Sequence, residues 1–337
     1  MKVLFIGGSG EISTACSQRA AQAGYEVYVL NRGVSSTRPL HSAVRRLKAD
    51  IRDPDSVRAA IGAREFDVVV TFLAFTPEDV RADLDRFAGR TGQYVFISSA
   101  SAYQKPVARL PILESTPLRN PVWPYSQAKI ACEELLTSAY REDGFPVTIV
   151  RPSHTYDRTQ VPCEGGWTVI ERMRRGLDIV VHGDGTSLWT LTHHTDFAKG
   201  FVGLLGHPQA IGDSFHITSD ETLTWNQIHE ILASAAGAEA RIVHVPSDAI
   251  REVDERWGRS LLGDKAHSLV FDNSKLRALV PGFMATTPFF RGAREIVDWH
   301  DADPARRRID PDMDARIDSL VDRFRTSGRA ALDELHS

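Results

Sequence analysis

An apolar run at residues 3–6 leads directly into a glycine turn, Gly7-Gly8-Ser9-Gly10, and this junction narrows the folds open to the chain. A continuous apolar run predicts a strand that is buried on both faces. Apolar residues then recur at helical spacing until Gly24, and a second strand is expected at 26–30. The order strand, turn, helix, strand predicts a βαβ unit with two parallel strands.

The same alternation continues to about residue 150. One further strand is expected to end near Leu47, and three others are expected at 67–71, 94–97 and 147–150. A short helix is expected after Asp53-Pro54, and two longer helices are expected at 77–88 and 124–140. Strands that alternate with helices of this length indicate a parallel sheet covered on both faces, with ligands at the carboxyl ends of the strands. The residues that follow the strands are therefore the candidates for chemistry.

The pattern weakens beyond Arg151. Helices are still expected at 167–174, 197–205, 225–233, 293–299 and 315–324. The 337 residues exceed the roughly 250 to 300 that one hydrophobic core serves. We therefore predict an α/β protein with two parts: a doubly wound parallel-sheet domain at 1–152 plus parts of 185–220, and a smaller C-terminal α+β cap, mostly at 153–184 and 221–337.

Composition restricts the partners and the compartment. Lys plus Arg is 40 against 44 Asp plus Glu, a formal net charge of -4, so no overall positive field draws the chain to nucleic acid or anionic lipid. Cys16, Cys132 and Cys163 form no Cys-x-x-Cys pair, which favours reduced thiols and a cytoplasmic location. No apolar stretch reaches the roughly eighteen residues of a membrane helix, so we expect no membrane segment.

The glycine turn is the first candidate binding site. Bare glycines let the backbone approach a pyrophosphate, which the N-terminus of the following helix stabilises. Gly7, Gly10 and Ile12 are thus expected to hold a dinucleotide. Ser13 stands where the usual fingerprint has a third glycine, and its small side chain still permits close packing. Glu11 is unusual beside phosphates, and a contact with the substrate is the alternative.

The end of the second strand bears on the choice of dinucleotide. Asn31-Arg32 stands where an Asp or Glu would bond the ribose 2′-hydroxyl of NAD. Asn31 can bond a hydroxyl, and Arg32 offers a guanidinium to a 2′-phosphate. We therefore predict NADP, with NAD as the other possibility. A solvated arginine in a turn is the alternative interpretation of Arg32.

Tyr125 and Lys129 are the candidate proton-transfer pair. A spacing of four on the helix that follows Pro124 puts both on one face. Tyrosine is a poor base at neutral pH, and we expect the Lys129 ammonium to lower the pKa of Tyr125. Ser99 follows a predicted strand and could bond the reacting oxygen, although capping of the strand end would explain it equally well.

These features together resemble the extended short-chain dehydrogenase/reductase family, whose best-known members are NAD(P)-dependent nucleotide-sugar epimerases and dehydratases. The resemblance covers most of the chain. Its motifs are the glycine turn, Asp50-Ile51, Leu73-Ala74, Ser98-Ser99-Ala100-Ser101-Ala102-Tyr103, Tyr-x-x-x-Lys, Arg151-Pro152, Gly183-Asp184-Gly185, the helix start at Asp196 and Asp272-Asn273-Ser274-Lys275.

The resemblance implies a Rossmann-type fold and assigns roles to single residues. Asp50 and Ile51 would hold the adenine, Leu73 and Ala74 would hold the ribose side of the cofactor, and Pro152 would also bind the cofactor. Tyr125 would be the acid/base, Lys129 would also bond the nicotinamide ribose, and Ser99 would orient the substrate oxygen. A homodimer is implied as well, formed by helices such as the one after Pro124.

Three departures from the family pattern concern the substrate. Ala100-Ser101 follows Ser99 where family dehydratases carry Asp-Glu, so a dehydratase is disfavoured. Trp189 stands where epimerases commonly carry an arginine that grips a diphosphate, and His154 replaces an asparagine. We expect Ser101, His154 and Trp189 to contact a sugar-like substrate, and Trp189 is equally compatible with a place in the core of the cap.

A metal site is not expected. His182, His193 and His194 match no standard zinc spacing, and Asp196 is better interpreted as the N-cap of a helix that starts at Phe197.

Three functions compete. The leading hypothesis is an NAD(P)-dependent sugar epimerase that acts by transient hydride transfer with no net consumption of cofactor. The second is an NADPH-dependent ketoreductase of a sugar or secondary-metabolite ketone. The third is a non-enzymatic RNA-binding relative of the family, against which the net charge of -4 argues.

Overall fold

The computed structural model describes residues 1–34 and 37–335. Within them a seven-stranded sheet has the order β11-β6-β5-β4-β1-β2-β3, and each neighbouring pair is parallel. The strands are β1 (Lys2–Ile6), β2 (Glu26–Asn31), β3 (Arg45–Lys48), β4 (Phe66–Thr71), β5 (Thr91–Ile97), β6 (Val147–Pro152) and β11 (Asp213–Ile217). The predicted α/β Rossmann-type fold is confirmed.

The strand order reverses at β1, which pairs with β2 on one side and β4 on the other. Val3, Leu4, Phe5 and Ile6 are fully buried, because helices cover both faces of the strand. A crevice opens at such a reversal outside the carboxyl ends of the strands. The glycine turn follows β1 at this point.

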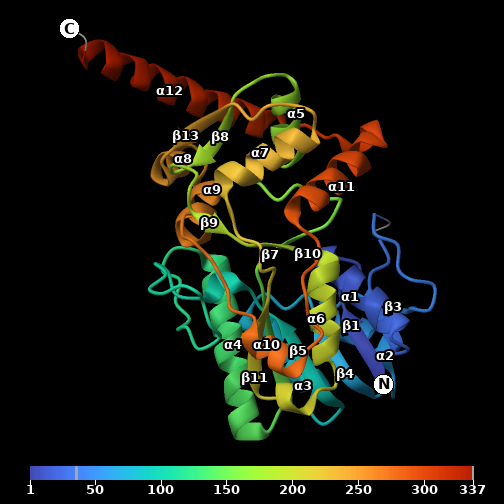
Figure 1. Cartoon of the computed structure of the whole chain (residues 1–337). Helices are drawn as coiled ribbons and strands as arrows, with labels where there is room; N and C mark the ends of the chain where they lie inside the picture. Colours follow the sequence, from blue (N-terminus) through green and yellow to red (C-terminus); the bar gives the residue numbers. More distant parts are fainter. Residues whose placement is uncertain (35–36, 336–337) are drawn as a thin grey trace.

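Helices cover the two faces of the sheet (Figure 1). Apolar side chains of α1 (Glu11–Gln22) and α6 (His194–Leu204) share one core cluster with the sheet. Those of α2 (Pro54–Ile61), α3 (Pro77–Phe87) and α4 (Pro124–Asp143) share the cluster on the other face. The predicted pattern of alternating strands and helices is confirmed to residue 152.

The remaining elements form a second lobe with its own hydrophobic core, in the upper part of Figure 1. Its helices are α5 (Trp167–Arg174), α7 (Trp225–Ala235), α8 (Ser247–Val253), α9 (Glu255–Ser260), α11 (Phe289–Asp301) and α12 (Pro311–Leu335). Three two-stranded pairings accompany them: β7 (His154–Tyr156) with β10 (Leu191–His193), β9 (Leu188–Trp189) with β12 (Leu223–Thr224), and β8 (Ile179–His182) with β13 (Ile242–Val245). The sequence pattern did not predict these short strands.

The predicted start of α6 is wrong. The helix begins at His194, so Asp196 lies in its first turn and is not its N-cap. The Asp196 carboxylate instead accepts hydrogen bonds from Lys199 Nζ at 2.6 Å and from the Thr287 backbone amide at 2.8 Å. A buried carboxylate near a helix N-terminus is favourable, and this one also ties the helix to the segment before α11.

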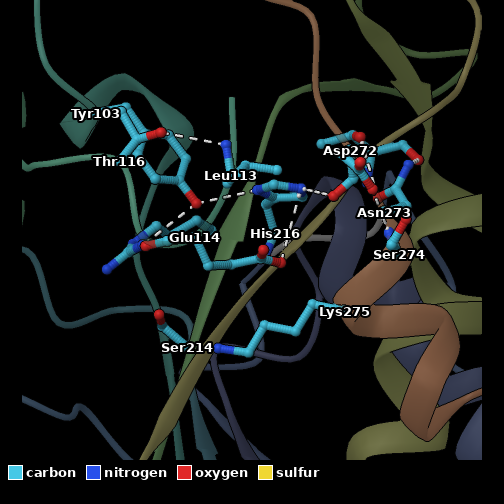
Figure 2. A network of polar contacts seen from close by, with 12 residues as sticks. Tyr103, Leu113, Glu114, Thr116, Ser214, His216, Asp272, Asn273, Ser274 and Lys275 are labelled. Atoms are coloured by element: carbon cyan, nitrogen blue, oxygen red, sulfur yellow. Dashed lines mark hydrogen bonds and ion pairs between the residues drawn. The ribbon is translucent and has the colours of Figure 1, made fainter. Parts of the chain in front are cut away.

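A buried polar network ties the edge strand β11 to the segment before α10 (Ser274–Leu279) (Figure 2). His216 Nε2 donates to the Asp272 carbonyl oxygen at 2.7 Å, so His216 Nδ1 accepts from Tyr103 Oη at 3.0 Å. Burial lowers the pKa of His216 to about 4, which keeps the ring neutral. Arg151 donates to the same Tyr103 oxygen at 3.2 Å and pairs with Glu133 at 2.6 Å. The Arg151 and Asp272 motifs therefore join the sheet to the C-terminal segments.

Candidate functional site

A cavity of about 690 Å³ lies where β1, β4, β5 and β6 end. We call it the central cavity. It is lined by many of the predicted site residues, from both parts of the chain: Gly7, Gly10, Glu11, Ile12, Leu73, Ser99, Ser101, Tyr125, Lys129, Pro152, His154 and Trp189. These residues are far apart in the sequence, and the parallel topology brings them together because the carboxyl ends of the strands share one edge.

Lys129 is held rigidly at the floor of the central cavity. Its side chain starts in the second turn of α4, and only 2% of the residue is exposed. Nζ donates to the carbonyl oxygens of Ala74 and Ile97, both at 2.8 Å. An ammonium has three N–H donors, so one remains for a group in the cavity. Burial lowers the pKa of Lys129 to about 8.

Ser99, Ser101 and Ser126 form a directed hydrogen-bond chain beside Tyr125. Ser126 Oγ donates to Ser101 Oγ at 2.7 Å, and Ser101 Oγ lies 2.9 Å from Ser99 Oγ. Since Ser101 accepts from Ser126, its own proton is available for Ser99. Ser99 Oγ also accepts from the Ser101 amide at 3.2 Å. Ser99 is also hydrogen-bonded to Tyr125, so the serine chain leads to the phenol.

The expected lowering of the Tyr125 pKa is wrong. Burial raises the pKa of Tyr125 above its ordinary value, a hydrogen bond with Ser99 opposes this, and the negative charge of Asp264 adds to it. Lys129 Nζ lies 6.0 Å from the centroid of the tyrosine ring and is directed to the two carbonyl oxygens. The predicted juxtaposition of phenol and ammonium exists, but the phenol is protonated at neutral pH.

Ser13 takes over the function of the missing glycine in the turn after β1. Its hydroxyl donates to the Gly7 carbonyl oxygen at 2.8 Å and accepts from the Gly10 amide at 2.7 Å, so the side chain holds the turn closed. Gly7 has a φ of +86°, and a Cβ there would lie 2.6 Å from Leu73 Cγ. The departure at Ser13 is therefore compatible with the turn, whereas Gly7 is required.

A second cavity of about 450 Å³ adjoins the first at Gly7, Gly10, Leu73 and Phe75. We call it the edge cavity. It is lined by the remaining predicted residues of this region: Asn31, Arg32, Asp50 and Ile51. Ala74 lines neither cavity; it is buried and contributes its carbonyl oxygen to Lys129.

The two adjoining cavities fit an extended dinucleotide. The backbone amides of Glu11 and Ile12, in the first turn of α1, have no intrahelical acceptor, and the helix N-terminus carries partial positive charge. Asn31 Oδ1 accepts from the Gly33 amide at 3.0 Å, which shapes the turn at the edge cavity. Arg32 lies at the exposed wall of the edge cavity. Among the described residues that line this cavity, Asp50 is the one carboxylate. The residues present therefore suit a phosphate-bearing ligand at the junction of the cavities.

Glu11 points toward the cap side of the central cavity. Burial raises the pKa of Glu11 to about 7; a hydrogen bond with Thr155 and the charge of Arg38 oppose this rise, and the charge of Asp157 adds to it. A carboxyl group in this environment is largely neutral below that pH. This removes the electrostatic conflict between Glu11 and a phosphate at the same helix end.

Trp189 is both a core residue and a wall of the central cavity. It is 3% exposed and packs against Trp225 at a centroid distance of 5.3 Å. Its Nε1 donates to His154 Nδ1 at 3.0 Å. Burial lowers the pKa of His154 to about 3, so this pair presents a neutral, aromatic surface.

Several lining residues were missed by sequence reasoning. Trp123, Asp264, Lys265 and Phe271 line the central cavity, and Ser126 supports it from behind. Trp123, which precedes α4, packs against Tyr125 with the rings tilted at 45° and their centroids 5.1 Å apart, a contact that its position two residues before the tyrosine could have suggested. Asp264 and Lys265 lie on a π-helical turn, Leu261–Lys265, that no motif marks.

The residues that the structure describes hold no group of three or more His, Cys, Asp or Glu side chains arranged for a metal ion. None of their helices is both long and apolar enough to cross a membrane.

The fold and the two cavities define a class: a dinucleotide-binding α/β protein with a Tyr-x-x-x-Lys site at the carboxyl edge of its sheet. Residues 3–218, more than half of the chain, match the NAD dependent epimerase/dehydratase family. The chain therefore belongs to this family, and the predicted resemblance to extended short-chain dehydrogenases/reductases and the predicted enzyme class are confirmed.

Individual relatives differ in what their names describe. A 2'-dehydrokanamycin reductase from Streptomyces kanamyceticus is 26% identical over 288 residues, 84% of this chain and 80% of the reductase. The chloroplast stem-loop binding protein of 41 kDa b from Arabidopsis thaliana is 28% identical over 72% of this chain, and the match spans 65% of that protein.

Solved structures share the fold at low identity. UDP-glucose 4-epimerase from Bifidobacterium longum, in complex with NAD+ and UDP, has a TM-score of 0.72 at 21% identity, covering 90% of this chain and 99% of the epimerase. dTDP-glucose 4,6-dehydratase from Bacillus anthracis, in complex with NAD, has a TM-score of 0.71 at 19% identity and covers 90% of this chain and 98% of the dehydratase.

Proposed function

We propose that this chain is an NAD(P)-dependent epimerase of a sugar or sugar-like alcohol, with Tyr125 as the acid and base. The observation that carries the proposal is that Tyr125, Lys129, Ser99 and Ser101 line one cavity beside the glycine turn. When bound, the nicotinamide supplies the hydride acceptor and donor. The chain's own residues position the substrate and move its proton.

Tyr125 Oη exchanges a proton with the oxygen of the reacting carbon. Because the pKa of Tyr125 is raised, the phenol is ready to donate that proton when a ketone is reduced. The Ser99 hydroxyl, at the end of the serine chain, donates a hydrogen bond to the same oxygen. In the oxidising direction the phenolate is required, and the remaining N–H of Lys129 stabilises negative charge on this side of the cavity.

Five residue groups are assigned to cofactor binding in this proposal. The glycine turn with Glu11 and Ile12 holds the pyrophosphate, and Asp50 and Ile51 hold the adenine. Leu73 and Pro152 contact the ribose and nicotinamide side, where Ala74 acts through its carbonyl bond to Lys129. Lys129 bonds the nicotinamide ribose. Asn31 and Arg32, in the edge cavity, favour NADP over NAD because the guanidinium can pair with a 2′-phosphate.

A second candidate is a net NADPH-dependent ketoreductase. The specific observation in its favour is that the reductase relative aligns over 84% of this chain. The serine chain and protonated Tyr125 also suit reduction without a return step. Both candidates use the same residues, and they differ in whether the cofactor is consumed.

One experiment separates the two candidates. Purified protein is denatured to identify any released nucleotide, and then assayed with NADPH or NAD+ and a panel of sugars and keto-sugars. A retained nucleotide and steady absorbance at the reduced-nicotinamide band during substrate conversion support the epimerase. Stoichiometric loss of NADPH supports the reductase.

The role of Tyr125 is tested with Tyr125→Phe. We expect kcat to fall by about 10² to 10⁴ while NAD(P) binding persists, because only the proton-transfer group is removed. Tyr140→Phe, on the same helix but exposed, is the matched control. Full activity of Tyr125→Phe would overturn the proposal. Salt-sensitive binding of an RNA stem-loop, together with no turnover on any sugar, would favour the RNA-binding alternative.

The homodimer, the cytoplasmic location and the division into sheet domain and cap stay predictions. Light scattering on the purified chain tests the first, and limited proteolysis between residues 152 and 221 tests the last.

A further inference from the structure

The central cavity is lined by both acidic and basic side chains in addition to Tyr125. Its lining ionisable groups, besides Tyr125, are Glu11, Lys129, His154, Asp264 and Lys265. His154 is neutral because burial lowers its pKa, and Lys129 spends two donors on backbone carbonyls. Glu11 is an acid whose pKa burial raises to about 7, so it offers no positive charge. The two remaining groups, Asp264 and Lys265, are adjacent on the π-helical turn.

Asp264 already has an ion-pair partner. Its Oδ1 lies 3.3 Å from Lys105 Nζ, and Lys105 is 1% exposed. A buried ion pair of this kind leaves little net charge for a ligand, and breaking it would be costly. Asp264 therefore does not offer a site for a cationic group of the substrate.

Lys265 has no such partner. Among the residues that the structure describes, no carboxylate lies within ion-pair distance of its Nζ, and its one recorded contact is with the face of Trp123 at 5.3 Å from the ring centroid. The side chain is half-buried; burial lowers its pKa, and the negative charges of Asp264 and Glu164 oppose this fall only in part, since neither forms an ion pair with Lys265 among the described residues. Its charge is also felt at His154, across the cavity. A desolvated cation in a ligand cavity is costly unless a ligand completes its pairing.

We propose that Lys265 binds a single carboxylate of the substrate, so that the substrate is a sugar acid and carries no nucleotide diphosphate. This rests on the proposed function and names its substrate class. A phosphate carries about -1.5 to -2 charges, and a diphosphate needs several donors. The central cavity provides one uncommitted ammonium and a neutral wall of His154 and Trp189. A carboxylate matches that single charge.

The test measures binding without turnover. Quenching of intrinsic tryptophan fluorescence, to which Trp123 and Trp189 contribute at the cavity, reports titrations with D-glucuronate, D-glucose and UDP in the presence of NAD+. We expect D-glucuronate to bind at least about tenfold more tightly than D-glucose, as one charge-assisted hydrogen bond allows. Lys265→Met should abolish this preference, and Lys265→Arg should keep most of it.

Lys48→Met is the matched control, because Lys48 is an exposed lysine on β3 that lines neither cavity. Equal affinity for the two sugars, no binding of glucuronate, tighter binding of UDP, or an unchanged preference in Lys265→Met would each overturn the proposal. Tyr125→Phe should keep the glucuronate preference. If the preference is present but no Tyr125-dependent turnover is found, the proposed function fails and the carboxylate site stands.

Discussion

Ser126 Oγ donates a hydrogen bond of 2.7 Å to Ser101 Oγ, which in turn lies 2.9 Å from Ser99 Oγ, so Ser126 is the first member of the serine chain. Ser126 is fully buried and does not line the central cavity, so it acts on the reaction only through Ser101. It is a positioning residue in the sense that its removal frees Ser101 to rotate.

Ser126→Ala should therefore lower kcat about tenfold, the value of one hydrogen bond, with little change in KM. The alkaline limb of the pH profile of kcat should shift as well, because the hydrogen-bond chain to Ser99 and Tyr125 is disturbed. Steady-state kinetics across pH measure both. Ser138→Ala, which removes an exposed hydroxyl bonded to Glu142 on the same helix, should behave as the wild type. An unchanged profile in Ser126→Ala would show that the chain has no catalytic effect.

Glu11 predicts a pH dependence of cofactor binding. Its pKa is raised to about 7 from an ordinary 4.5, so the neutral form, which tolerates a neighbouring pyrophosphate, prevails below that pH. As pH rises through this value the carboxylate forms and repels the phosphates, so affinity for NADPH should fall several-fold between about pH 6 and pH 8.

Glu11→Gln should remove most of that dependence in a fluorescence titration of NADPH. The charges of Arg38 and Asp157, which also act on Glu11, are present in both proteins, and Lys129, with a pKa of about 8, contributes equally in both. If the pH dependence of NADPH affinity persists in Glu11→Gln, that dependence is due to Lys129.

Arg32 decides between the two dinucleotides if the NADP proposal is right. Arg32→Glu should weaken binding of NADPH by about tenfold or more, through loss of a charge-assisted contact and gain of repulsion, and leave NADH unaffected or improved. Dissociation constants for both cofactors provide the test. Arg52→Glu, also at the edge cavity, is a control for the general field. Equal losses for NADPH and NADH would mean that Arg32 contacts no 2′-phosphate.

The buried ion pair of Arg151 and Glu133 predicts a large effect on stability. Glu133 accepts from Arg151 Nη2 at 2.6 Å and from Nε at 3.0 Å, and it also accepts from Ser98. Glu133→Ala leaves the arginine charge buried without a partner and should lower the free energy of unfolding by about 3 to 5 kcal/mol. Urea unfolding followed by circular dichroism measures it. Glu134→Ala, at the exposed neighbouring position, should change it by less than about 0.5 kcal/mol.

Local signals predicted the sheet domain well for physical reasons. The fully buried strands correspond to uninterrupted apolar runs in the sequence. The helices between them begin at recognisable residues, such as Asp53, the N-cap of α2. In the cap, the expected helices at 167–174, 225–233, 293–299 and 315–324 are found as α5, α7, α11 and α12, whereas α8, α9 and the strands were missed. Its strands, such as β9, have two to four residues each, and so short a segment shows no measurable alternation. The start of α6 was misplaced because Asp196 resembles an N-cap, while its carboxylate bonds Lys199 within the helix and the distant Thr287 amide.

The order of residues along the chain dictates the βαβ alternation, the glycine turn and the same-face pairing of Tyr125 with Lys129, because each depends only on neighbours within a few positions. Folding alone decides that Tyr125 stays protonated, that Ser13 closes the turn and that Ser126 bonds Ser101. It also decides that Lys265 lines the central cavity with no ion-pair partner among the residues that the structure describes. Those properties depend on burial and on side chains that are distant along the chain, and the electrostatic cost of burial exists only once the two parts of the molecule enclose the site.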